Sequence, residues 1–283
     1  MVKGLYTAYT GMINEQHRMD VLTNNLANAN TNGYKKEGAT AQAFSDQLAL
    51  KIKDYTDAPF TARGLGIINP GVKIGEGYVD WSEGPMKETG NTFDLALGGY
   101  GFFGIEYTNK AVNIEREIAG QTDIMYTRDG NFTLTNEGVL VTQDGDFVLS
   151  QDGGHIEIDP ALPVEINTLG EIIQDGEVVA TVGRFDFEKV TYPDGRITYN
   201  TLEHYGENLF IPTDDATQVT STASIYAGFL EQSNVSVVDE MVNMIAVQRN
   251  YDTNQRMITT IDGTLDIAAN QLGRLSQKLI LFL

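Results

Sequence analysis

The sequence predicts a mixed α and β fold, in which N- and C-terminal helices form a coiled-coil-like domain around an all-β middle domain. Three observations predict it. Apolar residues recur every seven positions at both chain ends, Asp-Gly pairs punctuate the middle, and charge follows the same division. Residues 1–50 carry no net charge and residues 231–283 carry −2, whereas residues 51–230 carry −18 and hold 23 of the 29 glycines.

These differences predict three parts. Residues 1–36 and 235–283 together are expected to form a terminal helical assembly domain. Residues 37–90 are expected to be an extended or partly β connecting segment, and residues 91–230 a β-rich outer domain. An amphipathic helix at a chain end has no core of its own, so the two ends must pack against each other or against ends of other molecules.

Composition narrows the function. The chain has 283 residues and a formal net charge of −20. Clustered Lys and Arg are needed to bind phosphates, and no basic run is longer than Lys35-Lys36, so no nucleic-acid partner is expected. There is no cysteine, which excludes disulfides and thiolate sites. No stretch is apolar enough for membrane insertion, and the first twenty residues contain no signal-peptide apolar core, so no cleavable signal is expected.

The first element is a helix predicted from about Gly4 to Asn28. Its narrow apolar stripe is typical of a helix that packs along another helix. The seam residues are Leu5, Met12, Met19 and Leu26, and the column three positions on holds Ala8, Leu22 and Ala29. An Asn-rich stretch follows, and Asn and Gly favour turns, so a sharp exit is expected near Asn32-Gly33.

The last element is a second and longer helix predicted over residues 235–282, about 70 Å at ~1.5 Å per residue. Apolar side chains in a heptad repeat of this length indicate a coiled coil. The first column is Val237, Met244, Tyr251, Ile258, Leu265, Leu272 and Leu279, and the second is Val247, Asn254, Ile261, Ala268, Leu275 and Phe282. Gly263 weakens the helix locally, so a bend or frayed turn is expected there.

The middle is predicted to be β structure. Five Asp-Gly pairs separate short runs rich in Val, Ile, Phe and Thr, which is a strong hairpin signal. The pairs are Asp129-Gly130, Asp144-Gly145, Asp152-Gly153, Asp175-Gly176 and Asp194-Gly195. A meander, sandwich or small barrel would fit their spacing.

No residue pattern indicates a catalytic, cofactor or metal site. Residues 99–104 spell GYGFFG, but a strand-like run follows where a dinucleotide site needs a helix, so a glycine turn is expected. Asp144, Asp146 and Asp152 lack the remaining ligands of a calcium loop. His17, His155 and His204 are expected in a helix, a turn and a loop, in that order, and none has a His or Cys partner at metal-ligand spacing. Among 39 carboxylates no pair stands out as a glycosidase dyad.

The chain resembles the bacterial flagellar rod and hook family of axial proteins. NNLANANTNGYKK and the segment from Glu231 to Ile258 are similar to the family's two terminal signatures. Three interior segments are similar in the same order: Asp94 to Phe103, Tyr126 to Leu149, and Tyr205 to Phe210. The N-terminal signature residues are Asn24, Asn25, Leu26, Ala27, Asn28, Asn30, Asn32, Gly33 and Tyr34. Length and the lead-in over residues 37–90 are most similar to the distal rod type, followed by the proximal rod type.

The resemblance implies a structural subunit of the flagellar basal-body rod without enzymatic activity. Copies of the chain would form a helical tube that transmits torque from motor to hook, lined by the terminal helices. Other rod and hook proteins and the flagellar export apparatus would be partners, and the chain would reach the basal body without a cleavable signal peptide. The alternatives are the hook protein, a peptidoglycan-acting envelope enzyme, and a trimeric fibre that uses the C-terminal coiled coil alone.

Overall fold

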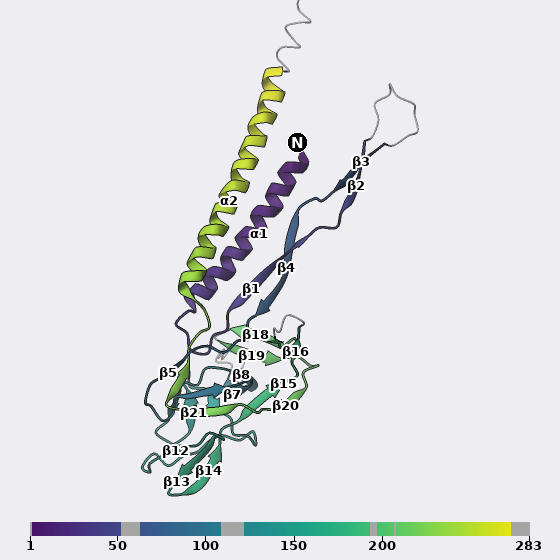
Figure 1. Ribbon diagram of the computed structural model, residues 1–283. Coiled ribbons are helices and arrows are strands. Elements are labelled where there is room, and N and C mark those ends of the chain that lie inside the picture. The colour runs from purple at the N-terminus through teal and green to yellow at the C-terminus, as the bar shows by residue number, and fades with distance from the viewer. Residues whose placement is uncertain (1, 52–62, 109–121, 193–196, 207, 273–283) are drawn as a thin grey trace, which may run out of the picture. The chain divides into compact units, whose positions relative to one another are not determined.

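The computed structural model describes residues 2–51, 63–108, 122–192, 197–206 and 208–272, which fall into two units. The helical unit comprises the described residues of Met1–Leu26, Glu37–Tyr78 and Val237–Leu283. The β body comprises those of Ala27–Lys36 and Val79–Ser236. A helix opens the chain, a helix follows the last strand, and the middle is mostly β (Figure 1). This confirms the predicted mixed fold class.

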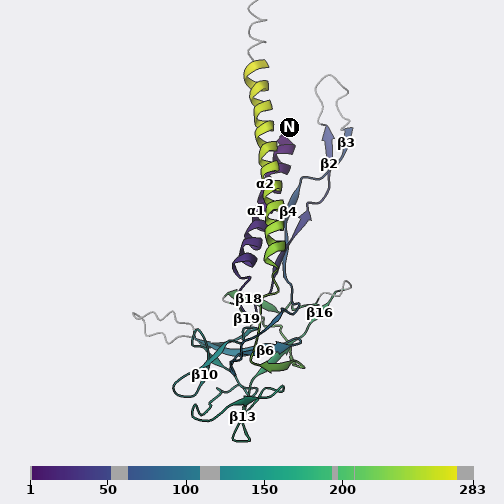
Figure 2. The same ribbon diagram turned by 60° about the vertical axis from the view of Figure 1, so that its left-hand side comes forward.

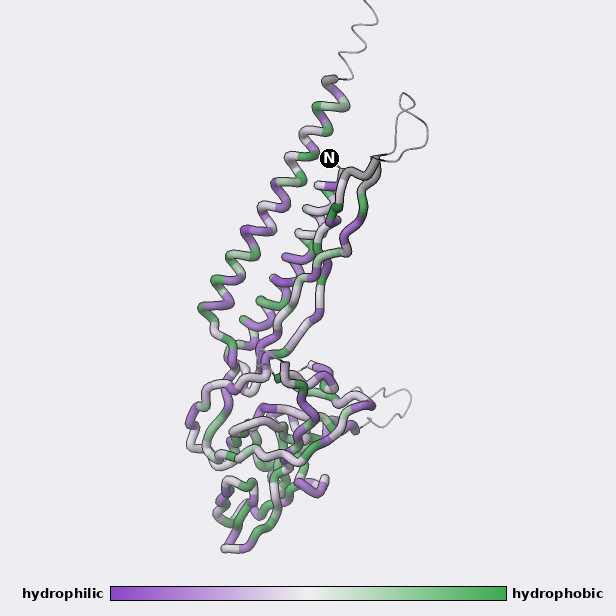
Figure 3. Tube along the Cα trace, turned by 45° about the vertical axis from the view of Figure 1, so that its right-hand side comes forward, coloured by the Kyte–Doolittle hydropathy of each residue, from purple (hydrophilic) through white to green (hydrophobic). Residues whose placement is uncertain are grey.

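Helix α1 spans Val2–Ala27, and α2 spans Val237–Asp266 before continuing as a π-helical turn, η1, at Ile267–Leu272. Apolar positions recur along both helices, as the heptads predict (Figure 3). Helix α2 passes through Gly263 as regular α-helix, and the change of geometry comes four residues later. Residues 273–283, which include the predicted seam residues Leu275, Leu279 and Phe282, lie outside the described residues. No described helix combines the length and apolarity needed to span a membrane.

The connecting residues of the helical unit form two ribbons of two strands each beside α1 (Figure 2). Isolated two-stranded ribbons are marginally stable in water, so packing against a helix matters. Thr7 Oγ1 donates to the Pro70 carbonyl over 3.2 Å, and Gly71 lies so close to Thr10 that a Cβ there would collide with the threonine hydroxyl. The paired strands are β1 (Glu37–Ala43) with β4 (Val72–Val79), and β2 (Gln47–Lys51) with β3 (Arg63–Ile68).

The β body is built around a nine-stranded sheet. Its main path runs β18-β19-β8-β7-β11-β10-β9, and β15 joins β7 to β20. These strands are β7 (Phe102–Thr108), β8 (Thr122–Thr127), β9 (Phe132–Leu134), β10 (Leu140–Thr142), β11 (Phe147–Val148), β15 (Arg184–Phe187), β18 (Leu202–Gly206), β19 (Leu209–Pro212) and β20 (Gln218–Thr220).

Smaller sheets complete the β body. Three strands form one antiparallel sheet: β12 (Glu165–Ile166), β13 (Glu171–Gln174) and β14 (Glu177–Thr181). Three further pairs are β5 (Met86–Glu88) with β22 (Phe229–Glu231), β6 (Leu95–Gly98) with β21 (Ser224–Ala227), and β16 (Val190–Thr191) with β17 (Ile197–Thr198). Strands β5 and β6 are near the start of the β body, and β21 and β22 are its last strands. Their pairing therefore places the segment that leaves the β body beside the segment that enters it.

The β body holds the apolar core. One cluster packs Leu97, Phe103 and Phe132 among aliphatic side chains, and a second is aromatic. In the second, Trp81 meets the Phe102 ring edge-on at a centroid distance of 5.4 Å. Edge-to-face pairs of this kind stabilise by roughly 0.5–1.5 kcal/mol beyond area burial. Trp81, near the start of the β body, is thereby packed against strand β7.

Several Asp-Gly pairs form the predicted turns. Asp175 and Gly176 both have positive φ, 50° and 85°, and connect β13 to β14 as a tight hairpin. Gly145, with φ 89°, lies in the turn between β10 and β11. Asp194-Gly195 lies outside the described residues.

The glycine-rich run at residues 99–104 is a turn that leads into strand β7, as predicted. Gly99 and Gly101 have φ of 101° and 149°, which favour glycine, and no helix starts there. One expectation was wrong: His204 lies in strand β18 and not in a loop. Its ring meets Phe210 across the β18–β19 pair at a centroid distance of 5.2 Å, and this aromatic contact favours the strand position.

Candidate assembly site

Helices α1 and α2 lie side by side and antiparallel (Figure 1). A Cβ on Gly4 would contact the Ile261 side chain at 3.5 Å, and one on Gly11 would lie 3.0 Å from the Asn254 amide. Near the other end, Asn25 Nδ2 donates to Glu240 Oε2 over 3.5 Å. In all three pairs the residue numbers add to 265, so the helices keep one register for three heptads.

The two predicted heptad columns form the least exposed stripe of α2. Between residues 241 and 270, every residue outside the two columns is exposed. The partly or fully buried residues are Met244, Tyr251, Ile258 and Leu265 from the first column and Val247, Asn254, Ile261 and Ala268 from the second. Val237 is 37% exposed, and the side chain of Leu272 lies outside the description.

On α1 the predicted seam residues Leu5, Met12, Met19 and Leu26 are all partly buried. The contact column is Gly4, Gly11 and Asn25, one residue earlier than the predicted column. Two small residues in this column let the backbones approach, which explains why apolar spacing alone does not show them. Ala8, from the second predicted column, is buried.

Asn25, in the N-terminal signature, is fully buried and clamps the end of α1. Its Nδ2 donates to the Glu37 carbonyl over 2.8 Å, and its Oδ1 accepts from the Glu37 N–H over 2.9 Å. The side chain thus satisfies both backbone groups at the start of β1, as one more strand would. Glu240 beside it is also fully buried, and a buried carboxylate needs hydrogen bonds of this kind.

The signature residues from Ala27 onward belong to the β body, where Gly33 makes the predicted sharp exit. Gly33 has φ 66°, and a Cβ there would lie 2.5 Å from the Arg128 carbonyl carbon. Its N–H donates to the Glu231 carbonyl over 2.7 Å. Asn32 offers its carbonyl to Asn208, and Tyr34 is buried. Asn24, Ala27 and Asn30 are exposed, and Leu26 and Asn28 are partly buried.

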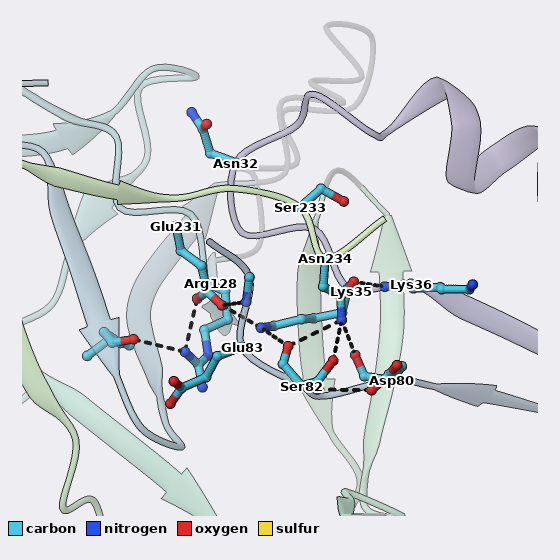
Figure 4. A network of polar contacts seen from close by, with 12 residues as sticks. Asn32, Lys35, Lys36, Asp80, Ser82, Glu83, Arg128, Glu231, Ser233 and Asn234 are labelled. Atoms are coloured by element: carbon cyan, nitrogen blue, oxygen red, sulfur yellow. Dashed lines mark hydrogen bonds and ion pairs between the residues drawn. The ribbon is translucent and has the colours of Figure 1, made fainter. Parts of the chain in front are cut away.

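A buried ion network joins the two signatures inside the β body (Figure 4). Glu231 Oε1 accepts from Lys35 Nζ over 2.6 Å and from the Gly84 N–H over 2.9 Å. Glu231 Oε2 accepts from Arg128 Nη1 over 3.0 Å. All three charged side chains are at most 2% exposed. One carboxylate of the last strand before α2 therefore holds together the chain leaving α1 and the residue that directly follows strand β8.

Two cations share this one carboxylate, and the unbalanced positive charge affects the pKa of Lys35. Burial lowers the pKa of Lys35 below its ordinary value, and the neighbouring Arg128 charge lowers it further, while Glu231 opposes both. The Lys35 Nζ also donates to the Ser82 carbonyl over 2.8 Å. Arg128 also donates from Nη1 to the Leu97 carbonyl and from Nη2 to the Gly99 carbonyl. Backbone oxygens thus take the place of a second carboxylate, and the Nε of Arg128 is left without a hydrogen-bond partner among the described residues.

Asn234 extends the network to the connecting strand (Figure 4). Its Oδ1 accepts from the Lys36 N–H over 2.7 Å, and its Nδ2 donates to the Asp80 carbonyl over 2.9 Å. The Asp80 N–H donates to the Lys36 carbonyl over 2.8 Å. The two chain segments that connect to the helices are thus fixed to each other by side chains from both signatures.

No group of three or more His, Asp or Glu side chains among the described residues is placed to hold a metal. His155 pairs with Glu106 and stacks on Phe147, while His17 lies in α1. Sequence reasoning missed Lys35, Arg128 and Glu231 as a set because they are about a hundred residues apart and follow no period. Their positions inside family-like segments were the available signal.

Three family models match segments of the chain. They are described as flagella basal body rod protein (residues 5–35), flagellar hook protein FlgE/F/G D1 domain (residues 96–180) and flagellar basal body rod FlgEFG protein C-terminal (residues 226–272). The first covers most of α1 and its exit, and the last covers β22, α2 and η1. The matched segments therefore include all three charged residues of the buried network.

Full-length relatives carry similar names. The chain is 32% identical over 279 residues to the flagellar basal-body rod protein FlgF of Caulobacter vibrioides, covering 98% of this chain and 99% of that protein. It is 33% identical over 286 residues to FlgG of Bacillus subtilis, covering 95% and 99%. The flagellar hook-basal body complex protein FlhO of Bacillus subtilis is 29% identical over 284 residues, covering 97% and 100%.

Proposed function

The chain belongs to the bacterial flagellar basal-body rod family, as a rod protein of the FlgG/FlgF type, and we infer that it is a structural subunit of the flagellar rod. The names of its matched families and relatives are those of structural flagellar proteins and not of enzymes. The structural observation that carries the inference is the helical unit, whose helices pair in one register yet keep large apolar side chains exposed.

We propose that copies of the chain polymerise through this unit into a helical tube. Residues 1–36 and 235–283 would act as the assembly domain, packed like a coiled coil, residues 37–90 would connect, and residues 91–230 would form the outer domain. The partly buried seam of Met244, Tyr251, Ile258 and Leu265 supports this, because a single helical partner covers only one side of it. The tube would transmit torque from motor to hook through packing alone.

We further propose association with other rod and hook proteins, and delivery through the flagellar export apparatus without a cleavable signal. The name of FlhO, a hook-basal body complex protein, supports the first. Delivery of an unfolded chain is supported by the small core of the helical unit, where Ala8 and Val247 are the buried apolar residues among those described. Helices with so small a core are weakly stable alone, so we expect them to become ordered only when the chains assemble.

The test compares two full-length variants that add the same charge to neighbouring residues. Val247→Asp places a carboxylate at a seam position that is 1% exposed, and Gln248→Asp places one on the exposed neighbour. A buried, unpaired carboxylate is strongly unfavourable, so Val247→Asp should abolish polymers while Gln248→Asp retains them. Electron microscopy of purified protein and motility of a strain carrying each variant provide the readouts.

A straight, stiff tube from the unchanged chain supports a rod subunit, and a curved, flexible tube points to a hook protein. Polymers formed equally well by both charge variants would contradict the proposed role of the helices. Release of soluble sugar from peptidoglycan by the purified chain would favour the envelope enzyme.

A further inference from the structure

Two apolar patches on the helical unit are left exposed by the pairing of α1 with α2. The α1 patch consists of Tyr6, Tyr9 and Ile13, and the α2 patch consists of Val238, Met241, Val242 and Ile245. Exposed fractions run from 38% at Ile13 to 70% at Val238. Spacings of three and four residues place the members of each patch on one helical face. Contiguous apolar surface of this kind marks an interaction site.

The two patches of one chain cannot meet. Gly4 and Glu240 lie at the α1–α2 contact, and Tyr6 and Val242 each follow one of them by two residues. Two residues rotate a side chain by more than half a turn about the helix axis, so Tyr6 and Val242 point away from the contact. The patches therefore face outward on opposite sides of the helix pair. They also lie at opposite ends of the helix pair. Paired residue numbers add to 265, so Tyr9 is level with Arg256, and Arg256 is 14 residues or ~21 Å along α2 from Val242.

The spacing of one patch is the mirror of the other. Along α1 the steps from Tyr6 to Tyr9 to Ile13 are three and four residues, and backwards along α2 the steps from Ile245 to Val242 to Val238 are also three and four. In an antiparallel contact, Tyr6 then meets Ile245, Tyr9 meets Val242 and Ile13 meets Val238. The residue numbers in all three pairs add to 251, which differs from the intramolecular register by two heptads.

We propose that the α1 patch of one copy docks on the α2 patch of a second copy that has the same orientation and is displaced along the helix axis by 14 residues, about 21 Å. This rests on the proposed self-assembly and specifies its contact. The antiparallel direction follows from the shared orientation, since α1 and α2 are antiparallel within each copy. Because two different patches meet, the contact is heterologous and propagates into an open polymer instead of closing as a dimer.

The surroundings of the α1 patch fit an apolar ridge. Tyr6 also borders a cavity of about 360 Å³ between α1 and the β2–β3 ribbon, with Leu48, Ile68 and Pro70 among its lining residues. Ile245 of the second copy comes level with Tyr6, one of the residues that line this cavity. Lys3, which lines the cavity, comes level with Gln248 of the second copy, four residues or about 6 Å along the axis from Asp252, whose opposite charge attracts it.

The surface area that this contact would bury is consistent with a polymer that grows by adding one copy at a time. The seven side chains would bury roughly 600 Å², about half of the ~1,200 Å² at the low end of stable pairwise complexes. A single contact is therefore weak, and a dilute chain remains a monomer. Each copy that joins a growing chain forms one such contact, so the fraction of chains in polymer rises with concentration.

The test uses cysteine pairs in the full chain, which has no cysteine of its own. Tyr9→Cys with Val242→Cys should, on mild oxidation of polymers, give a denaturation-resistant ladder of dimers, trimers and higher multiples. The matched control is Tyr9→Cys with Arg249→Cys, on the same face of α2 but one heptad further on, and it should give no ladder. Ile13→Cys with Val238→Cys tests the same register independently of whether one variant folds poorly.

Each other outcome overturns the inference. A ladder from the Arg249 pair alone would mean a stagger of 7 residues, and dimers from Tyr9→Cys alone would mean that the α1 patch pairs with itself. Polymers that form without any ladder would leave the rod subunit intact and reject this contact. Failure of the unchanged chain to polymerise would remove the proposed self-assembly and the inference together.

Discussion

The β body and the helical unit treat their apolar side chains in opposite ways. The largest fully buried side chains, among them Phe102, Phe103 and Phe210, all belong to the β body. In the described part of the helical unit, only Ala8 and Val247 are buried apolar residues, while Tyr6, Val238 and others are exposed. The β body therefore completes its core within one chain. We propose that the helical unit obtains its remaining burial from other chains. The predictions below test first the closed core of the β body and then the open surface of the helical unit.

The largest expected effect is on the buried network of the β body. Glu231→Gln keeps the shape of the side chain but leaves Lys35 and Arg128 as unpaired buried cations. Removing one partner of a buried ion pair costs about 3–5 kcal/mol, so the free energy of unfolding in urea should fall by that amount. Lys35→Met should cost less, because it leaves Arg128 and Glu231 as a neutral pair and removes a cation whose pKa is already lowered by burial. A larger loss for Lys35→Met would contradict this account of the network.

The next effect concerns the exit from α1. Gly33→Ala would place a methyl group against the Arg128 backbone in a left-handed conformation, and should cost about 2–5 kcal/mol. Gly145→Ala is the matched control, since Gly145 also has positive φ but has open space at its Cβ. The control should cost only about 1 kcal/mol, from the backbone conformation alone. Equal losses in thermal unfolding would show that the contact at Gly33 is unimportant.

A third change should stabilise the β body. Burial raises the pKa of Asp129 to about 6, so the folded state disfavours its charged form. The contribution of Asp129 to the free energy of unfolding is therefore most favourable below pH 3.8, where the side chain is protonated in both states. This contribution is lost as the pH rises through about 6 and the buried carboxyl must ionise. Asp129→Asn removes this loss and should raise the free energy of unfolding at pH 7 by about 1–2 kcal/mol. Its curve of stability against pH should be flatter between pH 4 and 6 than that of the unchanged chain.

The smallest effect on folding is expected from the α2 patch. Met241→Gln alters an exposed side chain, so the free energy of unfolding should change by less than about 0.5 kcal/mol. The concentration needed for polymer formation should nevertheless rise, because the patch is buried only between copies. Sedimentation measures the polymer and urea unfolding measures the chain. Thr260→Gln, an exposed change further along α2, should alter neither.

Residue spacing predicted the regular parts of the molecule. The helix expected from Gly4 to Asn28 spans Val2–Ala27, and the two heptad columns are the only residues of 241–270 that are not exposed. Asp175-Gly176 forms the hairpin that its type predicts. These features depend on periods of two or seven residues and on local backbone preferences, which a sequence displays directly.

Contacts between distant residues could not be predicted in this way. Asn25 with Glu240, and Lys35 with Glu231, are joined only once the chain has folded, and no period relates them. The contact column of Gly4 and Gly11 was missed because small residues leave no apolar signal. Family-like segments marked the neighbourhoods of these residues, while their pairing is visible only in the folded structure.

Amide hydrogen exchange of the full chain, as monomer and as polymer, tests the central claim most directly. Strands β7 and β8 should be strongly protected in both states, because their core lies within one chain. Helices α1 and α2 should exchange readily in the monomer and become protected in the polymer, with the largest gains at residues 6–13 and 238–245. Equal protection of the helices in monomer and polymer would contradict the claim that the helical unit is completed by other copies.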